Sequence, residues 1–259
     1  MNAELNILSE WFKTNKLSLN VKKTNYILFS LNKCKGSCDV PLVLNNTCIE
    51  FRPYFKFLGI FIDERLSWGT HITKLANKLT SSLYALKSVK YFMTGNPLKA
   101  LFFALFQSHI AYGLILWGSA PQKYIGRIRI LQKKAIRIIT NQPYNAHTSP
   151  LFHKLKILKF EDIHMIQLSQ FMHKMYHNEL PDPLNRKLVV NAQVHQHNTR
   201  AASNPRRPQI RTSIASNSIY YQSSGIWCNI DSKFRTIPQI SVFSSKLKSY
   251  FIQHYCFEK

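Results

Sequence analysis

The sequence predicts a mainly helical α+β fold, in which a small antiparallel β portion precedes a helical bundle and a looser helical C-terminal region. Short apolar runs bounded by turn residues occupy the first part of the chain, and a helical repeat of apolar residues begins near Trp68. The chain has 259 residues, 45% hydrophobic and 13% aromatic, so it can bury the core of one large or two small domains. We expect domain boundaries at 1–66, 67–141 and 142–259.

The N-terminal portion is predicted to open with an amphipathic helix, because apolar residues recur at helical spacing over the first sixteen residues. A polar turn at residues 19–24 then leads into a predicted apolar strand at residues 26–31. Together these segments indicate a helix that precedes the first strand of the β portion.

Two further features complete the β portion. Apolar runs at residues 41–44 and 47–51 flank Asn45-Asn46. Asn tolerates a left-handed φ, so this pair predicts a two-residue hairpin turn. Another strand is expected at residues 55–62, where Gly59 is typical of a bulge or of a close approach of another backbone.

The middle of the chain is predicted to form a helical bundle. Apolar residues every three or four positions over 72–89 predict a long helix. Asn96-Pro97 predicts the start of another, because Asn is a common N-cap and Pro suits the first helical position. This helix is apolar almost all round, so we expect it to be central. A further helix is predicted over residues 121–140.

The C-terminal region is expected to be looser. A helix is predicted over residues 160–177, followed by an extended basic linker at about 182–213 that is poor in apolar residues. A final helical pair is expected around Trp227 and from Ser241 onward.

The predicted helix 121–140 separates its charges from its apolar residues. At about 100° per residue, four cations share one narrow sector and five apolar residues share the opposite side, with only Ile130 on the wrong side. The cations are Lys123, Arg127, Lys134 and Arg137, and the apolar residues are Ile125, Ile128, Leu131, Ala135 and Ile138. Three interpretations are open: a solvated face, a face that binds phosphates, or a basic amphipathic helix for a membrane surface or a calmodulin-like groove.

The distribution of charge favours a polyanionic partner. The chain has 35 Lys and Arg against 12 Asp and Glu, a formal charge of +23. From Arg65 to Phe160 there are fifteen Lys and Arg and no Asp or Glu, although ordinary solvated helices mix both signs. Nucleic acid is the favoured partner, ahead of anionic membranes and acidic proteins. We predict that Lys74 and Lys78 join the four cations of helix 121–140 in contacting it.

Cysteines and carboxylates offer little for metal binding. The five cysteines are odd in number and scattered, so we expect reduced thiols, no disulfide-linked partner and no zinc site. The acidic pairs Asp63-Glu64 and Glu161-Asp162 precede predicted helices, where carboxylates favour the helix N-terminus, so we expect no metal site there either.

The sequence contains no segment predicted to direct or anchor the chain to a membrane. Two glutamates interrupt the N-terminus, which rules out a signal peptide, and the most apolar stretch, 98–117, is too polar to span a bilayer. We therefore expect a protein of the nucleus or cytoplasm that is not secreted and has no membrane partner.

An ordered set of residues along nearly the whole chain resembles the reverse transcriptases of non-LTR (LINE-type, jockey-like) retrotransposons. No single motif is specific, but their order is. The set comprises Trp11, Asn15-Lys16-Leu17, Leu19-Asn20, Lys23-Thr24, Phe57-Leu58-Gly59-Ile60, Asp63, Leu66-Ser67-Trp68, His71, Tyr112-Gly113, Trp117-Gly118, residues 132–137, Pro150-Leu151-Phe152, Leu155, Ile157-Leu158, Trp227 and residues 243–247.

The resemblance implies roles for the first two parts of the chain. Lys23, in the Asn-x-x-Lys-Thr segment that ends the palm, corresponds to the residue that assists the pyrophosphate leaving group in a complete enzyme. Phe57, Leu58 and Gly59 correspond to the primer grip. The basic helices after Trp68 correspond to the thumb, which closes on the template–primer duplex by its shape and charge.

The resemblance also implies that this chain is inactive alone. The family's metal-binding aspartates, in a Tyr/Phe-Ala-Asp-Asp motif, lie upstream of the segment that matches Trp11, and this sequence contains no such motif. The complete enzyme would need Mg²⁺, whereas we expect no cofactor in this chain. The alternative is a non-enzymatic nucleic-acid-binding protein derived from such an element.

Overall fold

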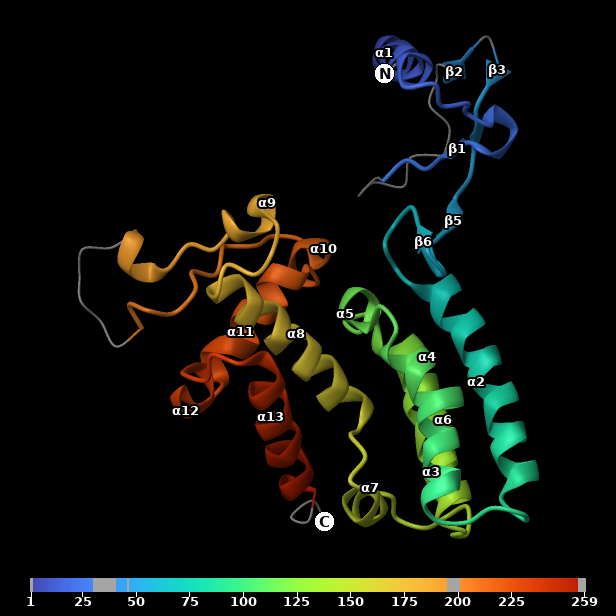
Figure 1. Cartoon of the computed structure of the whole chain (residues 1–259), viewed down its shortest axis with the longest axis vertical. Helices are drawn as coiled ribbons and strands as arrows, with labels where there is room; N and C mark the ends of the chain where they lie inside the picture. Colours follow the sequence, from blue (N-terminus) through green and yellow to red (C-terminus); the bar gives the residue numbers. More distant parts are fainter. Residues whose placement is uncertain (1, 30–40, 46, 195–200, 256–259) are drawn as a thin grey trace. The chain divides into compact units, whose positions relative to one another are not determined.

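The computed structural model describes residues 2–29, 41–45, 47–194 and 201–255. The chain divides into two compact units, residues 1–71 and 72–259, which are described separately below. Helices make up most of the described residues and the strands are short, so the predicted mainly helical α+β class is confirmed (Figure 1).

Where the structure describes it, the first unit combines the helix α1 with short strand pairs. Its elements are α1 (Asn2–Thr14), the 3₁₀ turn η1 (Val21–Lys23), β1 (Asn25–Tyr26), β2 (Val43–Leu44), β3 (Thr47–Cys48), β4 (Glu50–Phe51), β5 (Tyr54–Phe57) and β6 (Ile60–Asp63). Among the described residues these strands form three two-stranded sheets, parallel for β1–β4 and antiparallel for β2–β3 and β5–β6. Leu42, Leu44 and Ile49 form its small buried cluster.

The predicted helix and the first hairpin are confirmed, but the first strand is not. Strand β1 ends at Tyr26, and residues 27–29 adopt no regular secondary structure; residues 30 and 31 lie outside the described residues. In the hairpin, Val43 pairs with Cys48 and Leu44 with Thr47. Asn45 takes the left-handed φ of +48° that the sequence indicated, while Asn46 lies outside the described residues.

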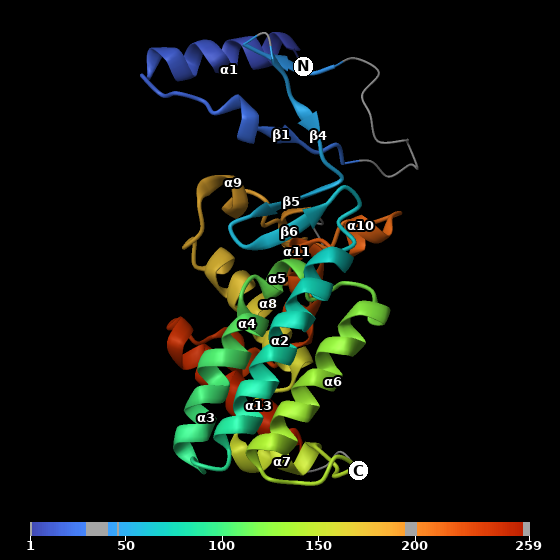
Figure 2. The ribbon, with the colours of Figure 1, turned by 90° about the vertical axis from the view of Figure 1, so that its right-hand side faces the viewer.

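The single strand predicted over residues 55–62 is wrong, because the chain reverses in its middle. Leu58 and Gly59 have φ of +45° and +86°, so they form the turn of a hairpin in which Phe57 pairs with Ile60 (Figure 2). A two-residue turn with both φ positive matches the right-handed twist of its strands. Gly59 therefore marks a turn and not a bulge.

Asp63 organises the loop that leads into the long helix after this hairpin. Its carboxylate accepts the backbone N–H of Ser67 and Trp68 at 2.9 and 2.8 Å. These bonds hold a turn in which Leu66 and Trp68 have positive φ. The predicted role of Asp63 before a helix is confirmed, and Glu161 and Asp162 likewise lie in the first turn of their helix.

The second unit is helical. Its elements are α2 (Gly69–Val89), α3 (Asn96–Phe102), the π-helical turn η2 (Phe103–Gln107), α4 (Ser108–Ala111), α5 (Leu114–Trp117), α6 (Gln122–Ile139), α7 (Ser149–Leu155), α8 (Phe160–Tyr176), α9 (Asp182–Asn185), the 3₁₀ turn η3 (Asn191–Gln193), α10 (Ser213–Ser216), α11 (Ile219–Asn229), α12 (Ser232–Arg235) and α13 (Ile240–His254). Helices α2, α3 and α6 lie side by side in both ribbon views (Figures 1 and 2).

The helix predicted from Asn96 is central but interrupted. Phe102, Phe106, Ile110 and Leu114 are fully buried, as expected. However, η2 breaks its regular pattern and Gly113 turns the chain with a φ of +61°. Asn96 is the first helical residue and not the N-cap, a position that Gly95 occupies.

A glycine allows close packing between α5 and α8. A Cβ atom at Gly118 would lie 2.4 Å from the imidazole ring of His164 on α8, so only glycine fits here. Trp117 is fully buried, and its ring lies 5.7 Å from that of Phe160. The Trp117-Gly118 pair of the resemblance therefore has a packing role.

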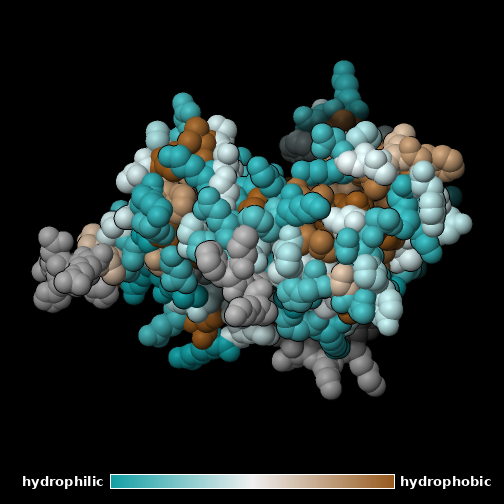
Figure 3. Space-filling model, turned by 90° about the horizontal axis from the view of Figure 1, so that it is seen from below, coloured by the Kyte–Doolittle hydropathy of each residue, from teal (hydrophilic) through white to brown (hydrophobic). Residues whose placement is uncertain are grey.

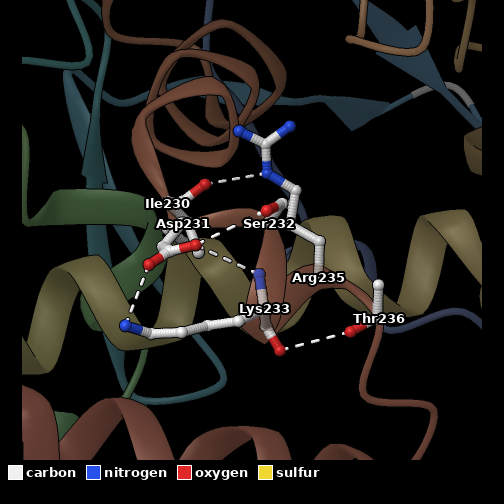
Figure 4. Close-up of polar contacts among 6 residues, drawn as sticks. All are labelled: Ile230, Asp231, Ser232, Lys233, Arg235 and Thr236. Carbon is white, nitrogen blue, oxygen red and sulfur yellow. Dashed lines mark hydrogen bonds and ion pairs between the residues drawn. The ribbon is translucent and has the colours of Figure 1, made fainter.

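The segment expected as an extended linker, 182–213, contains the short helix α9 and the turn η3, and it packs on the helices around it where it is described. The hydroxyl of Tyr176 on α8 donates to Ser203 O, and that of Tyr220 on α11 donates to Arg206 O. Arg235 donates to Asn204 and to Cys228 O. It also donates to Ile230 O, and beside it Asp231 caps α12 (Figure 4). The segment thus covers α8 and α11.

Four helices end in the same turn without glycine. After α1, α6, α7 and α8, the residue in the left-handed conformation is Lys16, Asn141, Lys156 or Asn178, with φ between +53° and +54°. Each turn has the paired backbone hydrogen bonds of a Schellman motif, such as Gln142 N to Arg137 O at 2.9 Å and Asn141 N to Ile138 O at 3.2 Å. These turns fix where the chain leaves each helix.

Candidate nucleic-acid interface

Helices α2 and α6 run parallel, and side chains link them near both ends. Near the start, Arg127 donates to the Asn77 side-chain oxygen at 3.2 Å. Near the end, Lys90 donates to the Asn141 side-chain oxygen at 3.1 Å. These links are 13 residues apart on one chain segment and 14 on the other. At 1.5 Å per residue both separations correspond to about 20 Å along the helix, so the two helices run parallel over this length.

Helix α6 presents three of its four predicted cations to solvent. Lys123, Arg127 and Lys134 are exposed. On the opposite side four of the five apolar residues, including Ile128, are buried, and Ile138 is half-buried. Ile130, the one residue on the wrong side, is 56% exposed. Because the apolar stripe packs inside the bundle, α6 cannot lay it on a membrane or in a calmodulin-like groove. The structure therefore removes the third interpretation of this helix.

Helix α2 carries the other two cations that the sequence predicts to contact nucleic acid. Lys74 and Lys78 are exposed, while Leu75 and Leu79, each next along the chain to one of them, are buried. Burial, and then the charge of Lys78, lower the pKa of His109 on α4. Ser82, one helical turn after Lys78, donates to Leu105 O in η2 at 2.7 Å, so Lys78 lies on the side of α2 that faces η2, whereas Asn77 reaches α6. The exposed cations of α2 and α6 therefore lie on two neighbouring helices.

Arg137 stands apart from the other predicted contacts. It is half-buried, and its Nε donates to Ala146 O at 2.9 Å in the loop after α6. Its guanidinium therefore supports this loop, and we take Lys123, Arg127 and Lys134 as the exposed line of cations on α6.

The sequence interpretation missed a polar cavity where α6, α7 and the start of α8 meet. Its volume is about 330 Å³, and its cations are Arg129, Lys133 and Lys159. Arg129 forms an ion pair with Glu161, and Lys159 donates to the Ser149 hydroxyl at 3.1 Å. No local motif could indicate this cavity, because its residues come from three helices.

In the first unit, Lys23 lies in a turn whose sequence explains its shape. The Asn20 side chain accepts the Lys23 N–H at 3.2 Å, and the Thr24 hydroxyl donates back to Asn20 O at 3.0 Å. This pattern accounts for the Asn-x-x-Lys-Thr spacing. The sequence pointed to Lys23, but the structure also places Arg52 and Lys56 with it, around a cavity of about 490 Å³.

The three predicted primer-grip residues lie together at the tip of the β5–β6 hairpin. Leu58 is 74% exposed and Phe57 55% exposed, and the positive φ of Gly59 completes the turn. An exposed apolar tip of this kind can contact another surface or a ligand.

The described residues hold no cluster of three or more His, Cys, Asp or Glu side chains suited to a metal ion. Cys48 and Cys228 are free thiols, and Cys34, Cys38 and Cys256 lie outside the described residues. In the part of the chain that the structure covers, no helix has the length and apolarity that crossing a bilayer requires.

Comparisons with known proteins agree on one class of relative. The RNA-directed DNA polymerase from mobile element jockey of Drosophila melanogaster is 27% identical over 196 residues, which cover 73% of this chain and 21% of that protein. The probable RNA-directed DNA polymerase from transposon BS of the same species is 29% identical over 161 residues, 61% of this chain and 18% of that protein. The chain spans about one fifth of the length of these relatives. No family model and no solved structure matches it.

Proposed function

We propose that this chain, a region of a non-LTR retrotransposon reverse transcriptase, holds a template–primer duplex on the basic face of α2 and α6. We define this duplex face as Lys74, Lys78, Lys123, Arg127 and Lys134. The observation that carries the proposal is the set of exposed cations along two parallel helices in a stretch without any carboxylate from Arg65 to Phe160.

The spacing of these cations suits a nucleic-acid backbone. Lys123 and Lys134 are eleven residues apart, about 16 Å along α6. A duplex carries phosphates throughout such a length, and a row of Lys and Arg binds them with the release of counterions. Contacts of this kind recognise backbone shape and charge and do not discriminate between sequences.

We further propose that the chain has no polymerase activity by itself. The sequence lacks the Asp-Asp motif of the family, and its described residues offer no carboxylate cluster for the Mg²⁺ ions of a complete enzyme. In such an enzyme, the cations Lys23, Arg52 and Lys56 would stabilise charge that develops on the leaving pyrophosphate.

A second candidate function is a non-enzymatic nucleic-acid-binding protein derived from such an element. It is favoured by the second unit, which has its own core and carries the whole duplex face. Both candidates share nucleic-acid binding and differ in whether the chain acts as part of a polymerase.

The proposal is tested by fluorescence anisotropy with a labelled RNA–DNA hybrid across a salt series. The double variant Arg127→Glu, Lys134→Glu is expected to bind more weakly and to flatten the plot of log affinity against log salt by about 0.9 for each lost phosphate contact. Lys246→Glu, Lys248→Glu on α13 is the matched control, because it makes the same charge change at exposed positions. An unchanged slope in the α6 variant would remove this face from the site.

The same samples are given a primer-extension assay with Mg²⁺. Tight, salt-dependent binding without extension is the expected result. Extension by the purified chain would contradict the proposed inactivity and would require other carboxylates to hold the metal.

A further inference from the structure

Exposed aromatic rings gather at the end of the bundle where α2 and α6 finish. Phe92 is 89% exposed, Tyr91 75% and Tyr144 90%. Tyr91 and Phe92 follow the end of α2, and Tyr144 lies in the loop after α6. Burying such a ring removes a large apolar surface from water, so three exposed rings in two adjacent turns call for an explanation.

The turn after α2 and the turn after α6 lie side by side, and hydrogen bonds hold both in place. Lys90 at the end of α2 donates to Asn141, which is also the left-handed residue of the Schellman turn after α6. Arg137 supports the same loop from the other side through Ala146 O. Both ribbon views show the two turns next to each other (Figures 1 and 2). The rings therefore project from turns that the fold holds in place.

The charged residues that neighbour these rings along the chain are all cations. Lys90 lies 5.3 Å from the centre of the Tyr91 ring, and Lys87 is exposed one turn earlier on α2. No carboxylate occurs anywhere between Arg65 and Phe160. Aromatic rings among cations are the combination that binds unpaired nucleic acid, because bases stack on the rings and phosphates pair with the cations.

We propose that this aromatic corner, defined as Lys90, Tyr91, Phe92 and Tyr144, binds the unpaired bases of a single-stranded nucleic acid. A duplex keeps its bases stacked on one another, so it can offer this surface only its backbone. The inference goes beyond the proposed function, because it assigns a different ligand to a surface that the duplex face does not include.

Two other occupants fit the corner less well. A membrane surface favours a continuous apolar stripe on one helix, whereas polar residues such as Thr94 and Gln142 interrupt this corner. Viewed from that end of the molecule, apolar atoms are broken up by hydrophilic ones on the side of α2, α3 and α6 (Figure 3). A second copy of the chain would bring two surfaces of the same charge together, which costs affinity.

The test measures binding of labelled oligo(U) RNA, oligo(dT) DNA and an RNA–DNA hybrid to the full chain by fluorescence anisotropy. Phe92→Ser and Tyr144→Ser are each expected to weaken single-strand binding about 5- to 100-fold, since one stacked base is lost. Hybrid binding is expected to stay unchanged. The RNA and DNA arms show which single strand the corner prefers.

A series at one position separates stacking from general apolar contact. Phe92→Trp is expected to keep single-strand binding, and Phe92→Leu to lose as much as Phe92→Ser, because leucine offers no flat ring. Ile130→Ser is the matched control, since it removes an exposed apolar side chain from α6 outside the corner. Circular dichroism verifies that each variant is folded.

Four results would overturn the inference. Binding restored by Phe92→Leu would mean apolar contact without stacking. Binding to phosphatidylserine vesicles that Phe92→Ser abolishes would mean a membrane site, and a concentration-dependent increase in mass abolished by Phe92→Ser would mean self-association. Equal weakening of hybrid and single-strand binding would place the corner within the duplex face. Loss of hybrid binding only in the α6 charge variant would leave the inference intact, so the two proposals fail separately.

Discussion

The two units of this chain bury their apolar residues to different degrees. In the second unit, the helices enclose large side chains completely, among them Phe102 and Trp117. Among the described residues of the first unit, Leu42, Leu44 and Ile49 form a small buried cluster, while Ile7 and Trp11 of α1 are 70% and 54% exposed. Two-residue strand pairs bury little surface, and such pairs are marginal in water without a third strand or a packed helix. The proposed duplex face, on α2 and α6, belongs to the second unit, which has the larger buried core.

The largest expected effect comes from truncating the core of each unit. Phe102→Ala should lower the free energy of unfolding of the second unit by about 3–5 kcal/mol, because a fully buried ring leaves a cavity. Leu44→Ala should unfold the first unit and leave the transition of the second unit in place. Urea denaturation followed by circular dichroism would show two transitions that respond separately. A single unfolding transition that both variants shift would show that the two units do not unfold separately.

One histidine in each unit, His164 half-buried and His71 buried, gives an effect of intermediate size on stability through pH. Burial lowers the pKa of His164 in the second unit to about 4, and it also lowers the pKa of His71 in the first. An unfolded histidine titrates near its ordinary pKa of about 6.5. Below that pH the unfolded chain binds a proton that the folded His164 does not, so stability falls as the pH drops from about 6.5 toward 4. At about 1.4 kcal/mol for each pKa unit, the loss attributable to His164 approaches about 3 kcal/mol.

His164→Gln is the variant that isolates this effect. Glutamine stays neutral, so the second unit should lose less stability than the native chain between pH 6.5 and 4. Its stability is measured by urea denaturation at several pH values. Parallel pH profiles for both proteins would show that His164 does not titrate in the folded state as its burial predicts. The first three residues of α2, residues 69–71, belong to the first unit, so His71→Gln should change the pH profile of that unit.

Helical periodicity predicted the second unit better than apolar runs predicted the first. The stripe of α2 and the two sides of α6, with Ile130 as the single exception, follow from a spacing that one helix fixes by itself. The strand expected over residues 55–62 fails because Leu58, an ordinary apolar residue, takes the positive φ that closes the hairpin beside Gly59. The strand predicted at residues 27–29 is also wrong, because a short apolar run forms a strand only where a partner strand pairs with it.

The candidate site divides in the same way. The cations of α6 could be found by their spacing on one helix, whereas the cavity around Lys23 depends on Arg52 and Lys56, which tertiary packing alone brings to it. The aromatic corner also depends on the link from Lys90 to Asn141, 51 residues apart. A set of site residues on one helix can be predicted from its spacing in the sequence. A set that tertiary packing assembles from several elements cannot.

The smallest expected effect compares the two Schellman turns that end in lysine, one in each unit. Lys16 after α1 and Lys156 after α7 both have positive φ, which strains a residue with a Cβ atom by about 1–2 kcal/mol. Glycine removes this strain but raises the entropy of the unfolded chain, at a cost of about 0.5–1 kcal/mol. Lys156→Gly should therefore raise the free energy of unfolding of the second unit by about 0.5–1 kcal/mol, as measured by urea denaturation.

Lys16→Gly should give a similar gain, but only in the transition of the first unit, because α1 packs against that unit's own small cluster through Leu5. Alanine at either position is the control, since it removes the lysine charge and keeps the strain. A gain from both alanine and glycine would attribute the effect to reduced charge repulsion in a chain of net charge +23. A gain in the second unit from Lys16→Gly would mean that the two units unfold together, and the difference between their cores would then not set the stability of either one.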